Sequence, residues 1–259
     1  MTWSRSVRIS PDTPVLSFVK FRGFDRALKG YRSFVQLLKS GQWEDSLVLL
    51  RSLYELNLNL SEVVCSREPE QAAKRFIKFG KFQLLRLEQK RLEDQLRDER
   101  LRPQPAAQTI SELERKLAAI ASTLDREFAE FRTPKGKRKG KQWQESWSGA
   151  SVETLAQRLA EKTGAKGGPN DYFVFRLASL FTHNTPGSLF LVLSRQRETT
   201  EWNEFQAALD KSGRDGVRPF LHLASICLVD IIGIAGDAIA GYERRWLDEF
   251  GLPLLEKFR

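Results

Sequence analysis

The chain has 259 residues, of which 41% are hydrophobic and 10% aromatic, so it can bury a sizeable core and is not intrinsically disordered. Lysine and arginine number 42 against 33 acidic residues, a formal charge of +9 that favours phosphate-rich partners or anionic membrane surfaces. The two cysteines lie far apart, and a structural zinc site would need both of them and both histidines, so a disulfide framework and a structural zinc site are excluded.

The N-terminus lacks the apolar segment of a signal peptide, so we expect a cytoplasmic protein. The most apolar stretch, residues 219–242, contains Asp230 and Asp237, and it predicts a core helix rather than a membrane span. We expect His222 to lie in the core and the two aspartates to face polar partners. Nucleotide-binding motifs such as G-x-G-x-x-G are missing, and we expect neither a cofactor nor a metal.

Apolar residues at helical spacing predict helices over residues 15–38 and 43–65, separated by Ser40 and Gly41. Residues 69–102 predict a long charged helix that ends before two prolines. A coiled-coil seam with spacing 3, 4, 3, 4 and 7 follows, and its residues are Ile110, Leu113, Leu117, Ile120, Leu124 and Phe131. We therefore expect residues 69–133 to form an antiparallel helical hairpin that projects from the body.

Residues 134–141 read PKGKRKGK and predict a flexible basic loop, because they combine two glycines with five cations and no acid. Ser151 is expected to cap a helix over residues 152–163, and further helices are expected from about Asn170 and around residues 201–211. Residues 189–193 fit either a strand or a helix. The fold class is all-α: a helical bundle of residues 1–68 and 142–259, the hairpin and the basic loop.

A polar stripe crosses the otherwise apolar helix that begins near Asn170. Its members fall at i, i+4, i+7 and i+11 and are Tyr172, Arg176, Ser179 and His183. Arg51 and Glu55 lie one turn apart on a leucine-rich helix, and Glu55 is positioned in sequence to bridge to Arg176 or to orient His183. The alternative is structural: Arg51 and Glu55 form an ordinary surface pair, and His183 favours the negative end of its helix.

Four short motifs between Arg51 and Leu189 resemble a bacterial family of all-α proteins of unknown function. They are R-S-L-Y-E at 51–55, R-F-I-K-F-G at 75–80, W-S-G-A-S-V at 147–152 and Y-x-x-x-R-x-x-S-x-x-x-H at 172–183. The resemblance implies a helical bundle and no mechanism.

Arg176, six intervening residues, His183 and then Asn184 resemble the R-x(4–6)-H motif of the HEPN superfamily of helical ribonucleases. The resemblance implies that His183 is the general acid or base in metal-free RNA cleavage and that Arg176 stabilises the developing charge. Leu177 departs from the motif, in which a polar residue commonly follows the arginine. The HEPN resemblance also implies that two chains meet at the site, since members of that superfamily usually act as dimers.

The basic loop suits RNA, because its cations can neutralise phosphates while Trp143 or Trp147 stacks on bases. The cations are Lys135, Lys137, Arg138, Lys139 and Lys141. Alternatively the loop is only solvated and both tryptophans pack on the core.

Two functions therefore remain: a HEPN-like ribonuclease acting as a toxin or antiphage effector, or a non-enzymatic module. The module would bind a protein partner, a second copy or nucleic acid through the hairpin and the loop.

Overall fold

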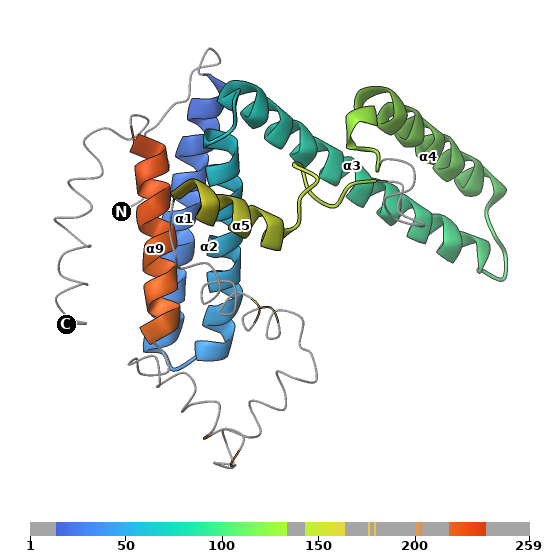
Figure 1. The fold of residues 1–259 in the computed structure, drawn as a ribbon. Coiled ribbons are helices and arrows are strands. Elements are labelled where there is room, and N and C mark those ends of the chain that lie inside the picture. The colour runs from blue at the N-terminus through green and yellow to red at the C-terminus, as the bar shows by residue number, and fades with distance from the viewer. Residues whose placement is uncertain are drawn as a thin grey trace. The chain divides into compact units, whose positions relative to one another are not determined.

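The computed structural model describes residues 14–133, 143–163 and 218–236, together with the single residues Arg176, Ser179, Thr200 and Asn203 (Figure 1). These residues form six α-helices and one short 3-10 turn, with no β-strand among them. The all-α fold class is therefore confirmed. The chain divides into two compact units, one of Met1–Glu70 with Val152–Arg259 and the other of Gln71–Ser151.

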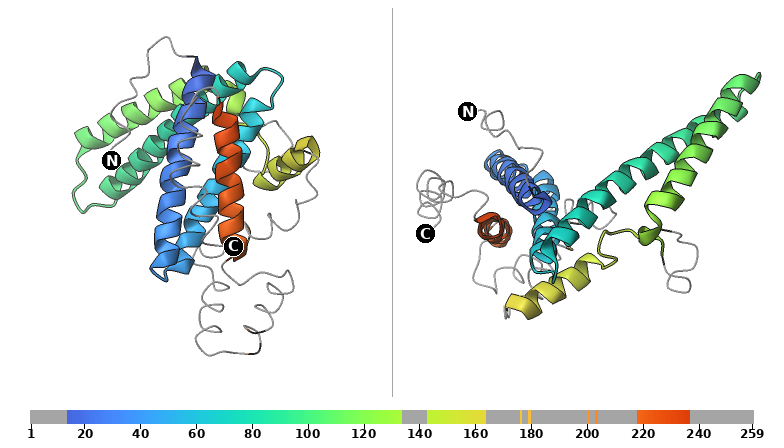
Figure 2. Two further views of the ribbon diagram at one scale, coloured as in Figure 1. Left: turned by 90° about the vertical axis from the view of Figure 1, so that its left-hand side faces the viewer. Right: turned by 90° about the horizontal axis from the view of Figure 1, so that it is seen from above.

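Three helices of the first unit, α1 (Val15–Lys39), α2 (Trp43–Val64) and α9 (Arg218–Ala235), pack pairwise against one another (Figure 2). The tight turn between α1 and α2 uses Gly41, whose φ of 74° favours glycine. Gly23 lets α1 approach α2 closely, because a Cβ there would lie 2.6 Å from Leu60 Cδ1. This glycine lowers helix propensity and is nevertheless required by packing.

α2 is the central helix of this unit, since it contacts α1, α9 and α5 (Val152–Thr163). Its leucines supply much of the core, and the side chains that are almost completely buried include Phe34, Leu47, Leu50, Leu58, Leu228 and Ile231. An ion pair of 2.8 Å between Arg158 Nη1 and Glu62 Oε1 joins α5 to α2. The helix that apolar spacing predicts over residues 43–65 is confirmed, and its leucines form the buried face.

α9 is apolar on the face that meets α1 and α2, but its other face is exposed. The expectation that His222 lies in the core is wrong, because His222 falls on the exposed face together with Val229, which is 57% exposed. Asp230 accepts a hydrogen bond of 3.0 Å from Asn57 Nδ2 of α2, as expected of a polar partner. Asp237 lies outside the described residues. Among the described helices none is long and apolar enough to cross a membrane.

The second unit contains the predicted hairpin, formed by α3 (Pro69–Arg100) and α4 (Ala107–Glu127) and followed by the 3-10 turn η2 (Ala129–Phe131). Its seam joins the two helices within the chain, because Leu113 is buried with Leu92 and Leu96 of α3. Three partly buried seam residues pack against this cluster: Ile110, Leu117 and Ile120. The turn is held by the buried Glu99, which accepts a 3.0 Å hydrogen bond from the backbone N–H of Ala106.

Candidate nucleic-acid interface

An aromatic cluster fills the end of the hairpin where α4 runs into η2. Phe79 and Phe82 of α3 meet Phe131 of η2, with ring centroids 5.1 and 5.5 Å apart. The ring of Trp143 lies 5.3 Å from Phe82, and Trp147 contacts Phe76 edge to face at 5.7 Å. Phe131 and Trp147 are 0% and 6% exposed. Several aromatic rings therefore pack together and supply the core of this part of the second unit.

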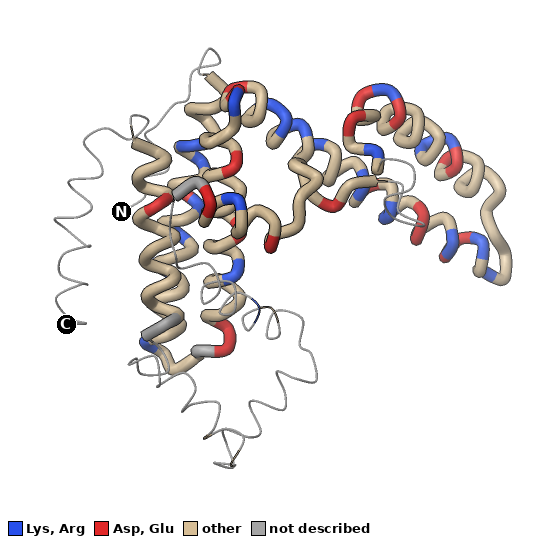
Figure 3. Tube along the Cα trace, in the orientation of Figure 1, with Lys and Arg blue, Asp and Glu red and all other residues tan. Residues whose placement is uncertain are grey.

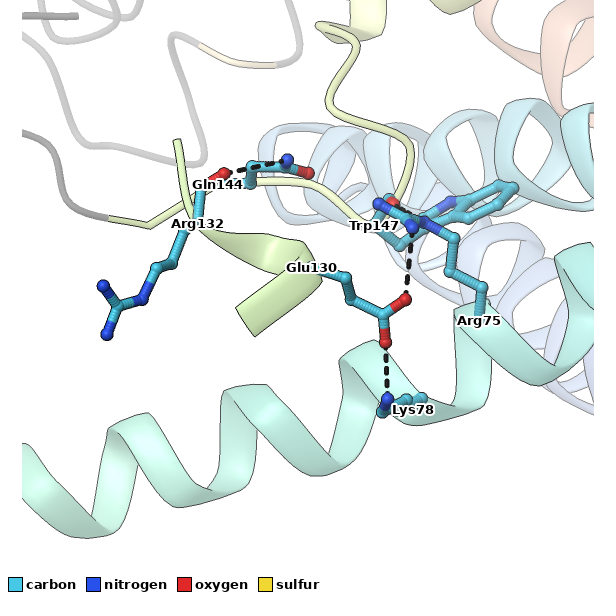
Figure 4. Close-up of polar contacts among 6 residues, drawn as sticks. All are labelled: Arg75, Lys78, Glu130, Arg132, Gln144 and Trp147. Atoms are coloured by element: carbon cyan, nitrogen blue, oxygen red, sulfur yellow. Dashed lines mark hydrogen bonds and ion pairs between the residues drawn. The ribbon is translucent and has the colours of Figure 1, made fainter. Parts of the chain in front are cut away.

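Cations lie on the rim of this cluster (Figure 4). The guanidinium of Arg75 lies 4.9 Å from the centroid of Phe131 and donates from Nε to the carbonyl oxygen of Trp147 at 2.9 Å. Glu130 neutralises part of this charge, with ion pairs of 3.4 Å to Arg75 and 2.6 Å to Lys78. Arg75 is therefore fixed by a ring contact, a hydrogen bond and an ion pair, and Lys78 by an ion pair.

The basic loop is anchored to the same cluster at both ends. Arg132 and Trp143 form an antiparallel bridge, and the N–H of Gln144 donates to the carbonyl oxygen of Phe131 at 2.8 Å. The guanidinium of Arg132 also lies 5.4 Å from the centroid of Trp143. The loop cations, within residues 135–141, are outside the described residues. Arg132 and Trp143, between which the loop segment runs, are adjacent.

Almost all of the net positive charge of the chain belongs to this region. We define the hairpin base as residues 71–87 and 128–151, which contain 11 lysines and arginines and 2 acids. The outer hairpin, residues 88–127, contains 8 cations and 9 acids, and ion pairs such as Lys90 with Asp94 and Lys116 with Glu112 connect many of them. Figure 3 shows cationic positions along the first half of α3 and mixed signs farther along the hairpin. A charge excess of this kind raises the local concentration of polyanions.

The predicted catalytic residues are only partly described. Arg51 Nε donates to Glu55 Oε1 at 3.0 Å on α2, so the two form the i,i+4 pair that the structural alternative expects. Their side chains are 21% and 36% exposed, so the pair is half-buried rather than fully solvated. Arg176 is helical and exposed, and Ser179 is helical and half-buried. Tyr172, His183 and Asn184 lie outside the described residues, so a convergence of Arg176, His183 and Glu55 stays a prediction.

Both predicted tryptophans contact the aromatic cluster. Trp147 is buried, as the packing alternative expected, whereas Trp143 is half-buried at its edge. Sequence reasoning missed the contribution of α3 to the basic surface. The sequence did contain a signal for this surface, because residues 71–87 include five cations and no acid. The five cations are Lys74, Arg75, Lys78, Lys81 and Arg86. In the described part of the chain no group of three or more His, Cys, Asp or Glu residues is arranged to hold a metal ion.

These features define an all-helical protein with a basic hairpin base built on an aromatic cluster. A family model described as a family of unknown function, DUF5677, matches residues 18–200. The match covers well over half of the chain, which therefore belongs to this family. It spans all four motifs between Arg51 and His183, and the expected membership of a family without an assigned activity is confirmed. No curated protein and no solved structure matches the chain.

Proposed function

We propose that the protein binds RNA through its hairpin base. The observation that carries the proposal is the charge distribution: the sequence of the hairpin base contains 11 cations and 2 acids and its described residues form an aromatic cluster, while the outer hairpin is close to neutral. Cations beside aromatic rings are the combination that binds single-stranded nucleic acid, since the cations neutralise phosphates and the rings stack on bases. Trp143 is the ring best placed to do so, because it is only half-buried and its segment continues into the basic loop.

Fluorescence anisotropy with a labelled single-stranded RNA at several salt concentrations tests the proposal. We compare the wild type with a loop variant that replaces Lys137, Arg138 and Lys139 by glutamine. Each phosphate contact on a single strand contributes about 0.7 to the slope of log K against log salt, so the loop variant should lose a slope of about 2.

The matched control replaces Lys90, Arg97 and Lys116 of the outer hairpin by glutamine, which removes the same charge from an exposed surface. The control should bind RNA with an affinity and a salt dependence close to those of the wild type. Equal losses in the two variants would mean that net charge alone attracts RNA, and the hairpin base would then be rejected as the interface.

A second candidate function is RNA cleavage without a metal ion, by a toxin or antiphage effector. It is favoured by the exposure of Arg176 on a helix, where its guanidinium is accessible to a phosphate. In this proposal His183 is the general acid or base, Arg176 stabilises the charge that develops on the phosphate, and Glu55 orients one of them.

Cleavage of a labelled RNA in the presence of a chelator, together with growth after expression in bacteria, tests this candidate. His183→Ala and Arg176→Ala should abolish cleavage and growth arrest while leaving RNA binding close to that of the wild type. Unchanged cleavage or growth arrest by His183→Ala would eliminate the ribonuclease. It would leave the non-enzymatic RNA-binding proposal intact, because the binding assay depends on other residues.

A further inference from the structure

The outer face of α9 carries a seam of its own. α9 packs on both α1 and α2, and this seam lies on the side away from those two helices (Figure 2). We call it the α9 strip. It consists of His222, Ile226, Val229 and Gly233, with spacings of 4, 3 and 4 residues. This is the a and d spacing of a coiled-coil helix.

Contacts inside the chain do not account for the composition of the α9 strip. Val229 is 57% exposed, and it is the one exposed large hydrophobic side chain among the described residues of the first unit. His222 and Gly233 are exposed as well, and Ile226 is half-buried. A glycine within a helix costs about 1 kcal/mol relative to alanine. Because a Cβ at Gly233 would meet no atom within 4 Å, packing inside the chain does not require this glycine, and the space above it can receive a side chain from another molecule.

The sizes of the four side chains make the α9 strip complementary to its own reverse. When two α9 helices lie antiparallel with Ile226 of each opposite Val229 of the other, His222 of each copy faces Gly233 of the other. The imidazole then fills the space above the glycine, and the β-branched side chains pack at the centre. Every contact occurs twice, as a two-fold symmetric interface requires.

The charges of α9 fit the same antiparallel pair. The strip contains no Asp, Glu, Lys or Arg, so it selects neither an acidic nor a basic partner helix. The only charged residues of α9 are Arg218 and Asp230, and an antiparallel pair separates each of them from its own copy, whereas a parallel pair brings like charges to the same level.

Asp230 also gives the imidazole of the second copy a hydrogen-bond acceptor. It is exposed and accepts from Asn57 through Oδ2, so its second carboxylate oxygen can accept from another molecule. In the antiparallel register His222 of the second copy stands opposite Gly233, three residues or about 4.5 Å along the axis from Asp230. An imidazole N–H can reach a carboxylate over this offset.

We propose that the α9 strip binds a second copy of the chain, with the two α9 helices antiparallel. Ile226 and Val229 form the centre of the contact, and each His222 packs on Gly233 of the other copy and donates a hydrogen bond to its Asp230. One helix pair buries less than the area of about 1,200 Å² at which standard stable interfaces begin, so we expect a dissociation constant in the micromolar range. The proposal is independent of RNA binding, since the strip shares no residue with the hairpin base.

Sedimentation equilibrium of the full-length protein at concentrations up to about 100 µM tests this proposal. The wild type should dimerise within this range. Val229→Glu should weaken dimerisation at least about tenfold, because the two-fold contact buries an unpaired carboxylate twice. Gln36→Glu is the matched control, since it adds the same charge at an exposed position of α1 outside the strip. The control should dimerise like the wild type, and circular dichroism should show unchanged helix content in both variants.

Disulfide cross-linking tests the antiparallel register. The background is Cys65→Ser, because Cys65 is exposed. An equal mixture of Ile226→Cys and Val229→Cys chains should cross-link faster than either variant alone. Fastest cross-linking of Val229→Cys chains alone would indicate a parallel pair and overturn the proposal. It is also overturned if Val229→Glu dimerises as tightly as the wild type, or if the wild type stays monomeric, since the strip would then have another occupant.

Discussion

Glu70, near the start of α3, accepts hydrogen bonds from the first two backbone N–H groups of α1. Its Oε1 lies 3.1 Å from the nitrogen of Val15, and its Oε2 lies 3.0 Å from the nitrogen of Leu16. The N-cap residue of α1 is Pro14, which makes no side-chain cap hydrogen bond. A residue 54 positions away in sequence therefore supplies the acceptor that a local Ser, Thr, Asp or Asn usually provides. We expect Glu70→Ala to destabilise the unit that contains α1.

The size of this effect follows from the two contacts of Glu70. A hydrogen bond to a charged group contributes about 1.5–3 kcal/mol, and partial exposure places these bonds at the lower end of that range. Because both bonds share one side chain, their contributions overlap, and we expect a loss of about 2 kcal/mol. This loss includes the favourable interaction of a carboxylate with the positive end of a helix. The melting temperature should fall by about 4–8 °C in a unit of this size.

Urea unfolding followed by circular dichroism at 222 nm measures the loss, with Glu68→Ala as the matched control. Glu68 carries the same charge two residues earlier and is exposed. The midpoint of the Glu68→Ala variant should stay close to that of the wild type, whereas the midpoint of the Glu70→Ala variant should fall. Equal midpoints in the two variants would refute the reasoning that Glu70 caps α1. Glu70→Gln should lie between the wild type and Glu70→Ala, because it keeps one acceptor oxygen and loses the charge.

Three further outcomes follow from the packing and the polar contacts. Gly23→Ala should lower the free energy of unfolding by about 1–3 kcal/mol, because the added Cβ would clash with Leu60. An unchanged melting temperature would show that the Leu60 side chain can move away. Glu99→Ala should lower the helix content and the resistance to proteolysis of the hairpin turn, since the N–H of Ala106 loses its acceptor; an equal cleavage rate in wild type and variant would contradict this role. Burial raises the pKa of Tyr31 above its ordinary value of 10.0, although the hydrogen bond to Ser225 partly opposes this. The folded form therefore keeps its proton longer than the unfolded form, and stability should fall as pH rises above about 10. Tyr31→Phe should reduce this fall in melting temperature, and an identical pH dependence in the two proteins would disprove the link.

Local sequence patterns were sufficient to predict the helices that the structure describes. Glycine and proline mark the ends of α1 and α3, and the leucine periodicity of α2 and of the hairpin seam indicates which faces are buried. The start of α5 at Val152 was also expected. These features depend on residues within a few turns of one another, and such patterns are visible without a three-dimensional structure.

The candidate interface was predictable only in part. The cations of the basic loop were recognised as a surface for phosphates, but the contribution of α3 was not. The aromatic cluster joins Phe82 to Trp143, 61 positions apart in sequence, and no local periodicity reports a contact of that range. The stripe from Tyr172 to His183 remains a prediction because Arg176 and Ser179 are its only described members.

The amino-acid sequence by itself determined that the protein is helical, basic and built around a leucine-rich helix, because helix periodicity and net charge are properties of the chain. The tertiary structure decided how these parts are used. It placed His222 on the exposed face of α9, brought Glu70 to the start of α1 and left Leu84 and Leu87 uncovered while their neighbours on α3 were buried. Each of these outcomes depends on which helix packs against which face, and that choice is made by contacts between residues distant in the chain.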